Sequence, residues 1–262
     1  MKKKNWAKKT AYENLKYVSA LLFLIFILAV LLGFYIGWIF NFRDSFMLLS
    51  GIVIGTCIYY MVEKVLQKKF LPRYAKYKGL IQGIAGEDAV NYALKNKLGK
   101  ENLVIADAVL NENIGNIDHI IIGQYGIFVV ETKTHRGRIV CDNDRWIQYK
   151  KIGESIVQID LKYSPSKQAR SNAAFLRDFL KQYYPMLSQE WINAIVVFPN
   201  KQFEGDNLEI KKEPQECKIF DSIDKMIDEI KKITPHIKLT PEDFIKLENI
   251  FMPIASDTTI TN

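Results

Sequence analysis

The chain has few of the residues that build disulfide frameworks and zinc sites. It contains three cysteines and three histidines in 262 residues. The cysteines at 57, 141 and 217 have no paired spacing, so neither a disulfide framework nor a zinc site is expected. The histidines form no cluster either. The chain also lacks a Gly-x-Gly-x-x-Gly loop, a phosphate-loop lysine and a nucleophile elbow. It therefore shows none of the common sequence signatures of dinucleotide, nucleoside triphosphate or serine-hydrolase sites.

Charged residues are missing from two long segments near the N-terminus. Residues 17–40 and residues 46–62 contain no acidic or basic side chain. A membrane-spanning helix needs about 20 apolar residues, and residues 41–45 between the segments can form only a tight turn. A signal peptide would have an apolar region of about 7–15 residues and a small-residue cleavage site, and the first segment has neither. We therefore expect two transmembrane helices within residues 17–66.

Basic residues on either side of these segments set their expected orientation. Residues 1–16 carry six lysines against one glutamate, and residues 63–78 carry six basic residues against one glutamate. The positive-inside rule then places both termini in the cytoplasm. Residues 1–16 would be a basic cytoplasmic N-terminus and residues 67–79 a basic connector. The protein is thus expected to be a multi-pass protein of the cell membrane, with its soluble domain in the cytoplasm.

The net charge of +7 comes from these flanks and not from the soluble part. Residues 79–262 carry 23 basic and 26 acidic side chains, which gives a net charge of −3. The basic flanks favour anionic lipid, so the overall charge does not indicate nucleic-acid binding.

Glycines in the apolar segments are spaced by four, at 33 and 37 and at 51 and 55. This spacing allows close helix contact, either within the hairpin or between protomers. Glycine is also frequent in membrane helices, so the pattern leaves a homo-oligomer open without requiring one.

The most informative pattern in the soluble part is a predicted β-hairpin. Residues 117–122 and 127–133 read as two strands, joined by a tight turn over Gly123–Gly126. A turn centred on residues 124 and 125 sets Asp118 directly opposite Glu131. Because side chains alternate along a strand, Lys133 shares the face of Glu131.

This arrangement suggests a metal site. Two carboxylates opposite each other repel, and a hard cation such as Mg²⁺ or Mn²⁺ between Asp118 and Glu131 would remove the repulsion. Lys133 could then orient a water molecule or stabilise charge on a phosphate. The alternative is ordinary: acidic residues and lysines are common at solvated strand ends, and cross-strand Asp–Lys pairs occur on many surfaces.

Two predicted helices carry further candidate residues. Residues 80–98 read as a helix whose inward stripe includes Glu87, and a carboxylate in an apolar row needs a partner. That partner could be a metal shared with the hairpin, or a cap or salt bridge. Ser164 and Pro165 start a second helix, and Gln168 lies in its first turn. Gln168 could point at the site or lie on a plain surface.

The other expected elements complete an α-β-β-β-α-β order. We expect strands over residues 103–110, 138–141, 146–149 and 192–198, helices over 222–232 and 241–251, and a frayed polar tail over 256–262. This order predicts an α/β fold of the restriction-endonuclease-like class, a mixed sheet flanked by helices, preceded by the transmembrane hairpin.

These motifs resemble a known family. The segment Gly83–Glu87, the hairpin from Ile117 to Lys133 and the following Arg136–Ile139 are similar to the nuclease-related domain (NERD). This family is grouped with the PD-(D/E)XK nucleases. The resemblance covers roughly Gly83 to Phe198. We therefore assign residues 80–200 to a NERD-like nuclease core and residues 201–262 to a C-terminal helical extension with a polar tail.

The resemblance implies a site and an activity. It places the family's site residues on Glu87, Asp118, Glu131, Lys133 and Gln168. The family often has Asn-Pro where this chain has Ser164-Pro165, which puts the match at Gln168 in doubt.

The implied protein is a membrane-anchored endonuclease that uses Mg²⁺ or Mn²⁺ to hydrolyse phosphodiester bonds of nucleic acid. DNA is favoured over RNA by the resemblance alone. The metal ligands would be Asp118, Glu131 and Glu87. Two alternatives remain: a non-catalytic module that binds nucleic acid or protein at the membrane, and a membrane assembly or sensor protein.

Overall fold

A computed structural model describes most of the chain after residue 70. The structure describes residues 71–261 except 111–114, 153, 188, 200–206 and 237. It also describes scattered positions before residue 71. The chain divides into two compact units, one of residues 82–262 with 1–5 and one of residues 6–81. The two charge-free segments fall almost wholly outside the described residues. Among the residues that are described, no helix is long and apolar enough to cross a membrane.

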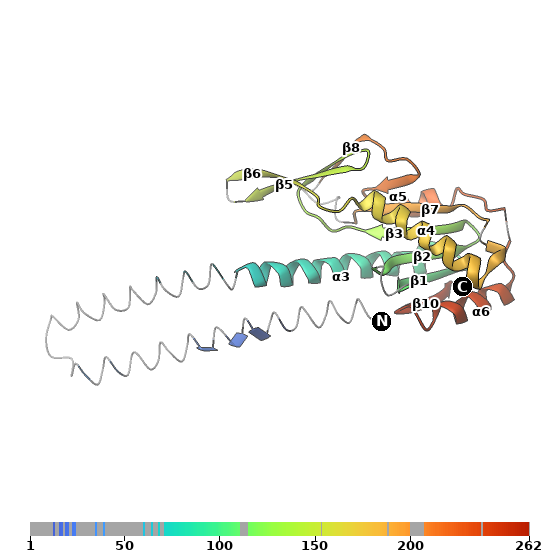
Figure 1. The fold of residues 1–262 in the computed structure, drawn as a ribbon, viewed down its shortest axis with the longest axis horizontal. Helices are drawn as coiled ribbons and strands as arrows, with labels where there is room; N and C mark the ends of the chain where they lie inside the picture. The colour runs from blue at the N-terminus through green and yellow to red at the C-terminus, as the bar shows by residue number, and fades with distance from the viewer. Residues whose placement is uncertain are drawn as a thin grey trace. The chain divides into compact units, whose positions relative to one another are not determined.

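A six-stranded mixed sheet forms the centre of the larger unit (Figure 1). Its order is β10-β1-β2-β3-β7-β9, in which β10, β1, β2 and β3 run antiparallel and β3, β7 and β9 run parallel. The strands are β1 (Asn102–Ala108), β2 (Ile117–Gly123), β3 (Gly126–Thr132), β7 (Ile192–Val197), β9 (Cys217–Phe220) and β10 (Asp257–Thr261). Strands β1, β2 and β3 are buried along their whole length, which is why they read as apolar runs.

Helices cover both faces of this sheet and bury a separate core on each. The helices are α3 (Leu71–Lys97), α4 (Pro165–Tyr183), α5 (Ile223–Ile230) and α6 (Pro241–Phe251). Apolar residues of α4 and α6 pack with Ile120, Ile127 and Val129 on one face. Those of α3 and α5 pack with Phe128 and Val130 on the other. The expected α/β class, a mixed sheet flanked by helices, is confirmed.

The register of the β2–β3 hairpin is the expected one. Gly123 pairs with Gly126 and His119 with Val130, so the turn is centred on residues 124 and 125. Gly126 has φ of +110°, a conformation that residues with a side chain rarely adopt. Turn chemistry and burial on both faces together fix this register, because a slip of one residue would turn every side chain to the opposite face.

The polar tail differs from the expectation. Instead of fraying, residues 257–261 form β10 and pair with β1 from Asn102↔Thr261 to Ala106↔Asp257. Asp257 also bonds Lys95 and Asn91 of α3. The prediction of a frayed tail was wrong because the polarity of an edge strand reflects its exposure and does not prevent backbone pairing.

A second sheet has four strands, of which three lie between β3 and α4 in sequence and the fourth, β8, follows β7. Its order is β6-β5-β4-β8, and the strands are β4 (Arg138–Asp142), β5 (Arg145–Ile152), β6 (Ser155–Asp160) and β8 (Asn207–Lys212). The expected hairpin of β4 and β5 is confirmed, with Cys141 paired to Trp146. β6 and β8 have no buried residues and were not predicted from the sequence.

Candidate active site

Asp118 and Glu131 lie at one end of the β2–β3 hairpin and are both buried. Their exposed fractions are 4% and 1%. The register that pairs His119 with Val130 sets Asp118 opposite Glu131 when it is continued by one residue. Alternation along the strands puts both side chains on the face that α4 covers, with Ile120 and Val129. Two carboxylates thus enter the α4-side core at neighbouring positions.

Each carboxylate has a polar partner that helps to compensate its burial. The backbone N–H of Thr132 donates to Oδ2 of Asp118 at 2.9 Å. The ammonium of Lys133 lies 2.5 Å from Oε1 of Glu131. A buried charge without such partners would be strongly destabilising. The trio of Asp118, Glu131 and Lys133 has a formal charge of −1, so it retains an excess of negative charge.

Lys133 is held by its backbone and by a second side chain. Its N–H donates to the carbonyl of Val197 at 2.9 Å, which extends the β3–β7 pairing beyond Thr132. Its ammonium also donates to Oε1 of Gln168 at 3.2 Å. The Lys133 side chain is 21% exposed. Lys133 therefore links the buried Glu131 to Gln168 on α4 and lies closer to solvent than Glu131.

Asn172 is a residue of this cluster that the sequence analysis did not identify. It is 4% exposed, and its Nδ2 donates to Oε2 of Glu131 at 3.4 Å. Lys133 and Asn172 thus contact the two oxygens of Glu131 separately. The sequence indicates this position only through its spacing. Asn172 follows Gln168 by four residues, and residues four apart share one helix face.

The start of α4 is fixed by its own sequence. Ser164 is the N-cap and accepts a hydrogen bond from the N–H of Lys167, and Pro165 occupies the first turn. Both features were expected, and they place Gln168 one turn into the helix. The first turn therefore sets the position from which Gln168 reaches Lys133.

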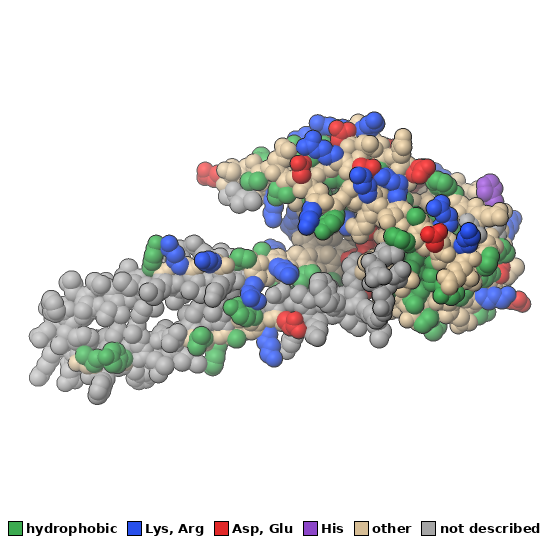
Figure 2. All heavy atoms as spheres, in the orientation of Figure 1, with side chains coloured by type: hydrophobic (Ala, Val, Ile, Leu, Met, Phe, Trp, Pro, Cys, Tyr) green, Lys and Arg blue, Asp and Glu red, His purple; other side chains and the backbone are tan. Residues whose placement is uncertain are grey.

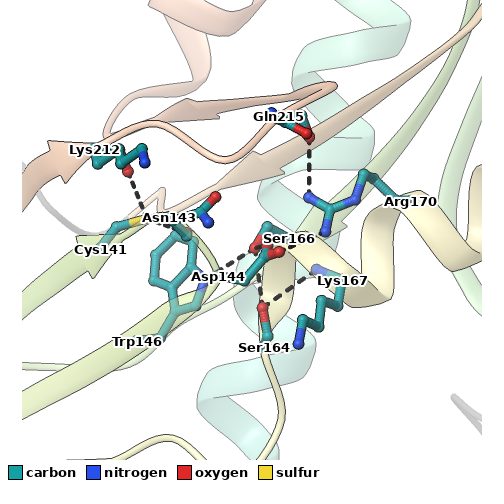
Figure 3. Close-up of polar contacts among 10 residues, drawn as sticks. All are labelled: Cys141, Asn143, Asp144, Trp146, Ser164, Ser166, Lys167, Arg170, Lys212 and Gln215. Atoms are coloured by element: carbon teal, nitrogen blue, oxygen red, sulfur yellow. Dashed lines mark hydrogen bonds and ion pairs between the residues drawn. The ribbon is translucent and has the colours of Figure 1, made fainter.

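A polar network ties this first turn to the β4–β5 turn (Figure 3). Asp144 accepts from Ser166 Oγ at 2.6 Å and from Arg170 Nη2 at 2.8 Å. Ser166 in turn accepts from the buried indole of Trp146 at 3.1 Å, and Arg170 donates to the carbonyl of Gln215 at 3.0 Å. These bonds hold the helix that carries Gln168 and Asn172 against the second sheet.

The charges in this network are mutually stabilised. The hydrogen bond from Arg170 holds the pKa of Asp144 below its usual value, and the same bond raises the pKa of Arg170. The Trp146 ring also stacks on Phe198, with ring centroids 5.6 Å apart. Since Phe198 follows β7, the network and the stacked rings together join both sheets to α4.

Glu87 is placed differently from the hairpin carboxylates. It is half-buried on α3, the helix that covers the opposite face of the sheet. The neighbouring residues of α3 meet the chain just after Lys133, where Gln82 donates to the carbonyl of Thr134 at 2.8 Å. A Cβ on Gly86 would lie only 2.2 Å from Cγ2 of Thr134. The structure thus brings Asp118, Glu131, Lys133 and Gln168 together on one face, and it places Glu87 on the helix that covers the other face.

The donor atoms at this site suit a hard cation that keeps some of its water. Among the described residues, no group of three or more His, Cys, Asp or Glu side chains is close enough to hold a metal ion. Mg²⁺ is commonly bound by one or two carboxylates plus water and substrate phosphate, and Asp118 with Glu131 provides two carboxylates.

The two described cysteines do not offer nucleophiles. Burial raises the pKa of Cys141 and of Cys217 to about 12. Both thiols are free and buried, and they stay protonated near neutral pH. Nucleophilic thiol chemistry by these two residues is therefore not expected.

Comparison with known proteins gives one family match. No curated protein and no solved structure matches the chain. A family model does match, over residues 82–199, and its description is "Nuclease-related domain" (NERD). The matched region runs from α3 through β7 and includes all five predicted site residues. Residues 82–199 are therefore similar to the nuclease-related domain, and this similarity suggests a nuclease-like or nucleic-acid-related module.

Proposed function

We propose that the protein is a membrane-anchored, metal-dependent nuclease that hydrolyses phosphodiester bonds of nucleic acid at the cytoplasmic face. The observation that carries the proposal is the ammonium of Lys133, which contacts Glu131 and Gln168, while a second buried carboxylate, Asp118, lies on the strand beside Glu131. This cluster lies within the nuclease-related domain. Buried, paired ionisable groups at a strand end are more typical of a functional site than of a stabilising core.

Asp118 and Glu131 would hold the Mg²⁺ or Mn²⁺ ion. The fit rests on their neighbouring positions, on the excess negative charge of the trio, and on the preference of these ions for carboxylate oxygen. When bound, such an ion lowers the pKa of a water molecule and polarises a phosphoryl oxygen. Glu87, on α3, remains a proposed additional ligand. Its substitution by glutamine tests that role separately from Asp118 and Glu131.

Lys133 would stabilise charge on the phosphate, and Gln168 and Asn172 would hold Lys133 and Glu131 in position. The ammonium of Lys133 is within reach of solvent and can stabilise negative charge on a phosphate. Gln168 holds this ammonium through its side-chain oxygen. Asn172 holds the oxygen of Glu131 that Lys133 does not contact. Gln168 and Asn172 both lie on α4, and the network around Asp144 holds the first turns of this helix. The network therefore supports the position of both side chains.

The second sheet supplies basic groups that the net charge of the soluble part does not reveal. Its strands carry Arg138, Arg145, Lys150, Lys151, Lys211 and Lys212 against Asp142, Asp160 and Glu209. All six basic residues are exposed, and Lys and Arg side chains are prominent over this part of the molecule in Figure 2. Such a surface can contact the phosphates of a nucleic-acid backbone. DNA is proposed over RNA on the family resemblance alone.

A cleavage assay with the full chain tests the proposal. Plasmid and single-stranded substrates are incubated with Mg²⁺, with Mn²⁺ and with EDTA, using wild type and Asp118→Asn. We expect cleavage by wild type with a divalent ion, none with EDTA, and none by Asp118→Asn. Metal-independent cleavage, or full activity of Asp118→Asn, would contradict the proposed site.

A second candidate function is a non-catalytic binding module at the membrane. It is favoured by the Lys133–Glu131 ion pair, which already compensates Glu131 without a metal ion. This alternative predicts salt-dependent binding of nucleic acid with no cleavage under any metal. The same assay, run with a binding measurement, separates the two functions.

A further inference from the structure

Strand β6 forms an edge of the second sheet and exposes apolar side chains. All six of its residues are exposed. The exposed fractions are 73% for Ile156, 39% for Val157 and 37% for Ile159. In the sheet order β6 pairs only with β5, so within the described part of the chain its other edge has no strand beside it. The β5–β6 hairpin reaches beyond the rest of the second sheet (Figure 1).

Apart from Asp160 at its end, this edge carries little of the usual protection against pairing. Natural edge strands are commonly shortened, bulged, or marked with lysine or proline, because open backbone groups invite another strand. The sequence of β6, Ser-Ile-Val-Gln-Ile-Asp, contains neither lysine nor proline. Its pairing with β5 is regular from Ile147↔Asp160 to Ile152↔Ser155. A regular, apolar and open edge is suited to accept a strand.

The backbone groups available at this edge can be identified. The N–H of Leu161 donates to the carbonyl of Trp146 on β5 at 2.9 Å. Because the direction of these groups alternates along an antiparallel strand, residues 157 and 159 also direct theirs to β5. The amide and carbonyl groups of Ile156, Gln158 and Asp160 therefore point to the open edge.

We propose that β6 pairs antiparallel with β6 of a second copy of this chain, with Gln158 opposite Gln158 of the copy. This arrangement would join two four-stranded sheets into one. Ile156, Gln158 and Asp160 would each bond the copy, in pairs related by the two-fold axis. The proposal does not depend on the nuclease function.

The side chains select this register over its neighbours. With Gln158 on the axis, Val157 lies opposite Ile159 of the copy, so four aliphatic side chains meet on one face. Glu154 and Lys162, which flank the strand, lie opposite each other twice, with opposite charges. Asp160 lies opposite Ile156 of the copy and already has Arg145 as an ion-pair partner at 3.5 Å. A shift that centres the axis on Val157 would instead set Glu154 against Asp160, and like charges directly opposite destabilise a sheet.

Site-specific cross-linking of the full chain tests this register. Gln158→Cys and Ser155→Cys are each made in a Cys57→Ser background, which leaves only the buried Cys141 and Cys217. In the proposed pairing the two copies of residue 158 face each other across about 5.5 Å between Cα atoms. The two copies of residue 155 are about 20 Å apart at roughly 3.3 Å per residue. A short bis-maleimide reagent can join the first pair and not the second.

The expected result is strong covalent dimer formation by Gln158→Cys and little by Ser155→Cys. Adding Val157→Lys to Gln158→Cys should reduce the dimer, since it places lysine among the aliphatic side chains at the interface. Val157 is outside both core clusters, and an unchanged thermal unfolding transition would show that the domain is intact. Equal cross-linking at positions 155 and 158, no cross-linking at 158, or an undiminished dimer with Val157→Lys would overturn the proposal.

Discussion

Replacing Lys133 by methionine removes the ammonium that pairs with Glu131 and keeps a side chain of similar length. Removing one partner of a fully buried ion pair costs about 3–5 kcal/mol, because the remaining charge stays buried. Exposed pairs contribute only about 0.2–1 kcal/mol. Glu131 is 1% exposed and Lys133 21% exposed. The loss should therefore fall between the exposed and the buried ranges, at about 2–3 kcal/mol.

This loss can be measured as a change in thermal unfolding. For a domain of this size each kcal/mol shifts Tm by about 2–4 °C, so Lys133→Met should lower the Tm of the metal-free protein by roughly 4–12 °C. If Asp118 and Glu131 share a cation, Mg²⁺ or Mn²⁺ can replace the missing ammonium. The metal should then raise the Tm of Lys133→Met by more than it raises that of wild type.

Lys95→Met is the matched control. Lys95 has a similar exposed fraction, 23%, but its partner Asp257 is 37% exposed. The remaining Asp257 charge would be solvated, so this variant should lose less than about 1 kcal/mol and show no added response to metal. Equal losses in the two variants, or the same metal response in Lys133→Met as in wild type, would refute the reasoning about the buried carboxylates.

Four further predictions follow from the same contacts. Asn172→Ala should reduce cleavage about 10–100-fold and weaken metal dependence, as is typical of groups that hold a metal ligand; unchanged metal titration would exclude this positioning role. Gly86→Ala should destabilise the domain by about 1–3 kcal/mol through the contact with Thr134, and adding Thr134→Ala should restore most of the loss in thermal unfolding. The pKa of Asp144 is depressed in the fold, so its stabilisation is present above the unfolded value of about 4 and is lost as pH falls below it; the stability difference between wild type and Asp144→Asn should shrink in acid unfolding. In intact cells, an impermeant thiol reagent should label Ser45→Cys and not Lys4→Cys, and the reverse pattern would overturn the expected orientation.

The hairpin of the site could be predicted from the sequence because local signals determine it. The glycines at 123 and 126 mark the turn, and alternation along the strands then sets Asp118, Glu131 and Lys133 on one face. The start of α4 was equally local, since Ser164 and Pro165 mark it. The contact of Gln168 with Lys133 was expected only as one of two alternatives, because the sequence does not show which strand a helix face meets.

Other features depend on tertiary packing and left no comparable signal. Periodicity showed that Glu87 lies on the inward side of α3, but not that α3 covers the face opposite Asp118. Asn172 reads as an ordinary polar helix residue until the helix is placed against Glu131. β10 and β6 are polar or exposed, so neither has the burial pattern by which strands are recognised. The transmembrane hairpin stays a prediction, because its segments lie outside the described residues.

The most direct test of the account is the cleavage rate of Lys133→Ala measured together with its metal binding. Lys133 is proposed to stabilise charge on the phosphate and not to hold the metal. We therefore expect cleavage to fall by orders of magnitude while Mn²⁺ still binds and still raises Tm, with Thr132→Ser retaining near wild-type activity as a control from the opposite strand face. Cleavage by Lys133→Ala at the wild-type rate would contradict the proposed mechanism, and the absence of cleavage by wild type with any metal would favour the non-catalytic module.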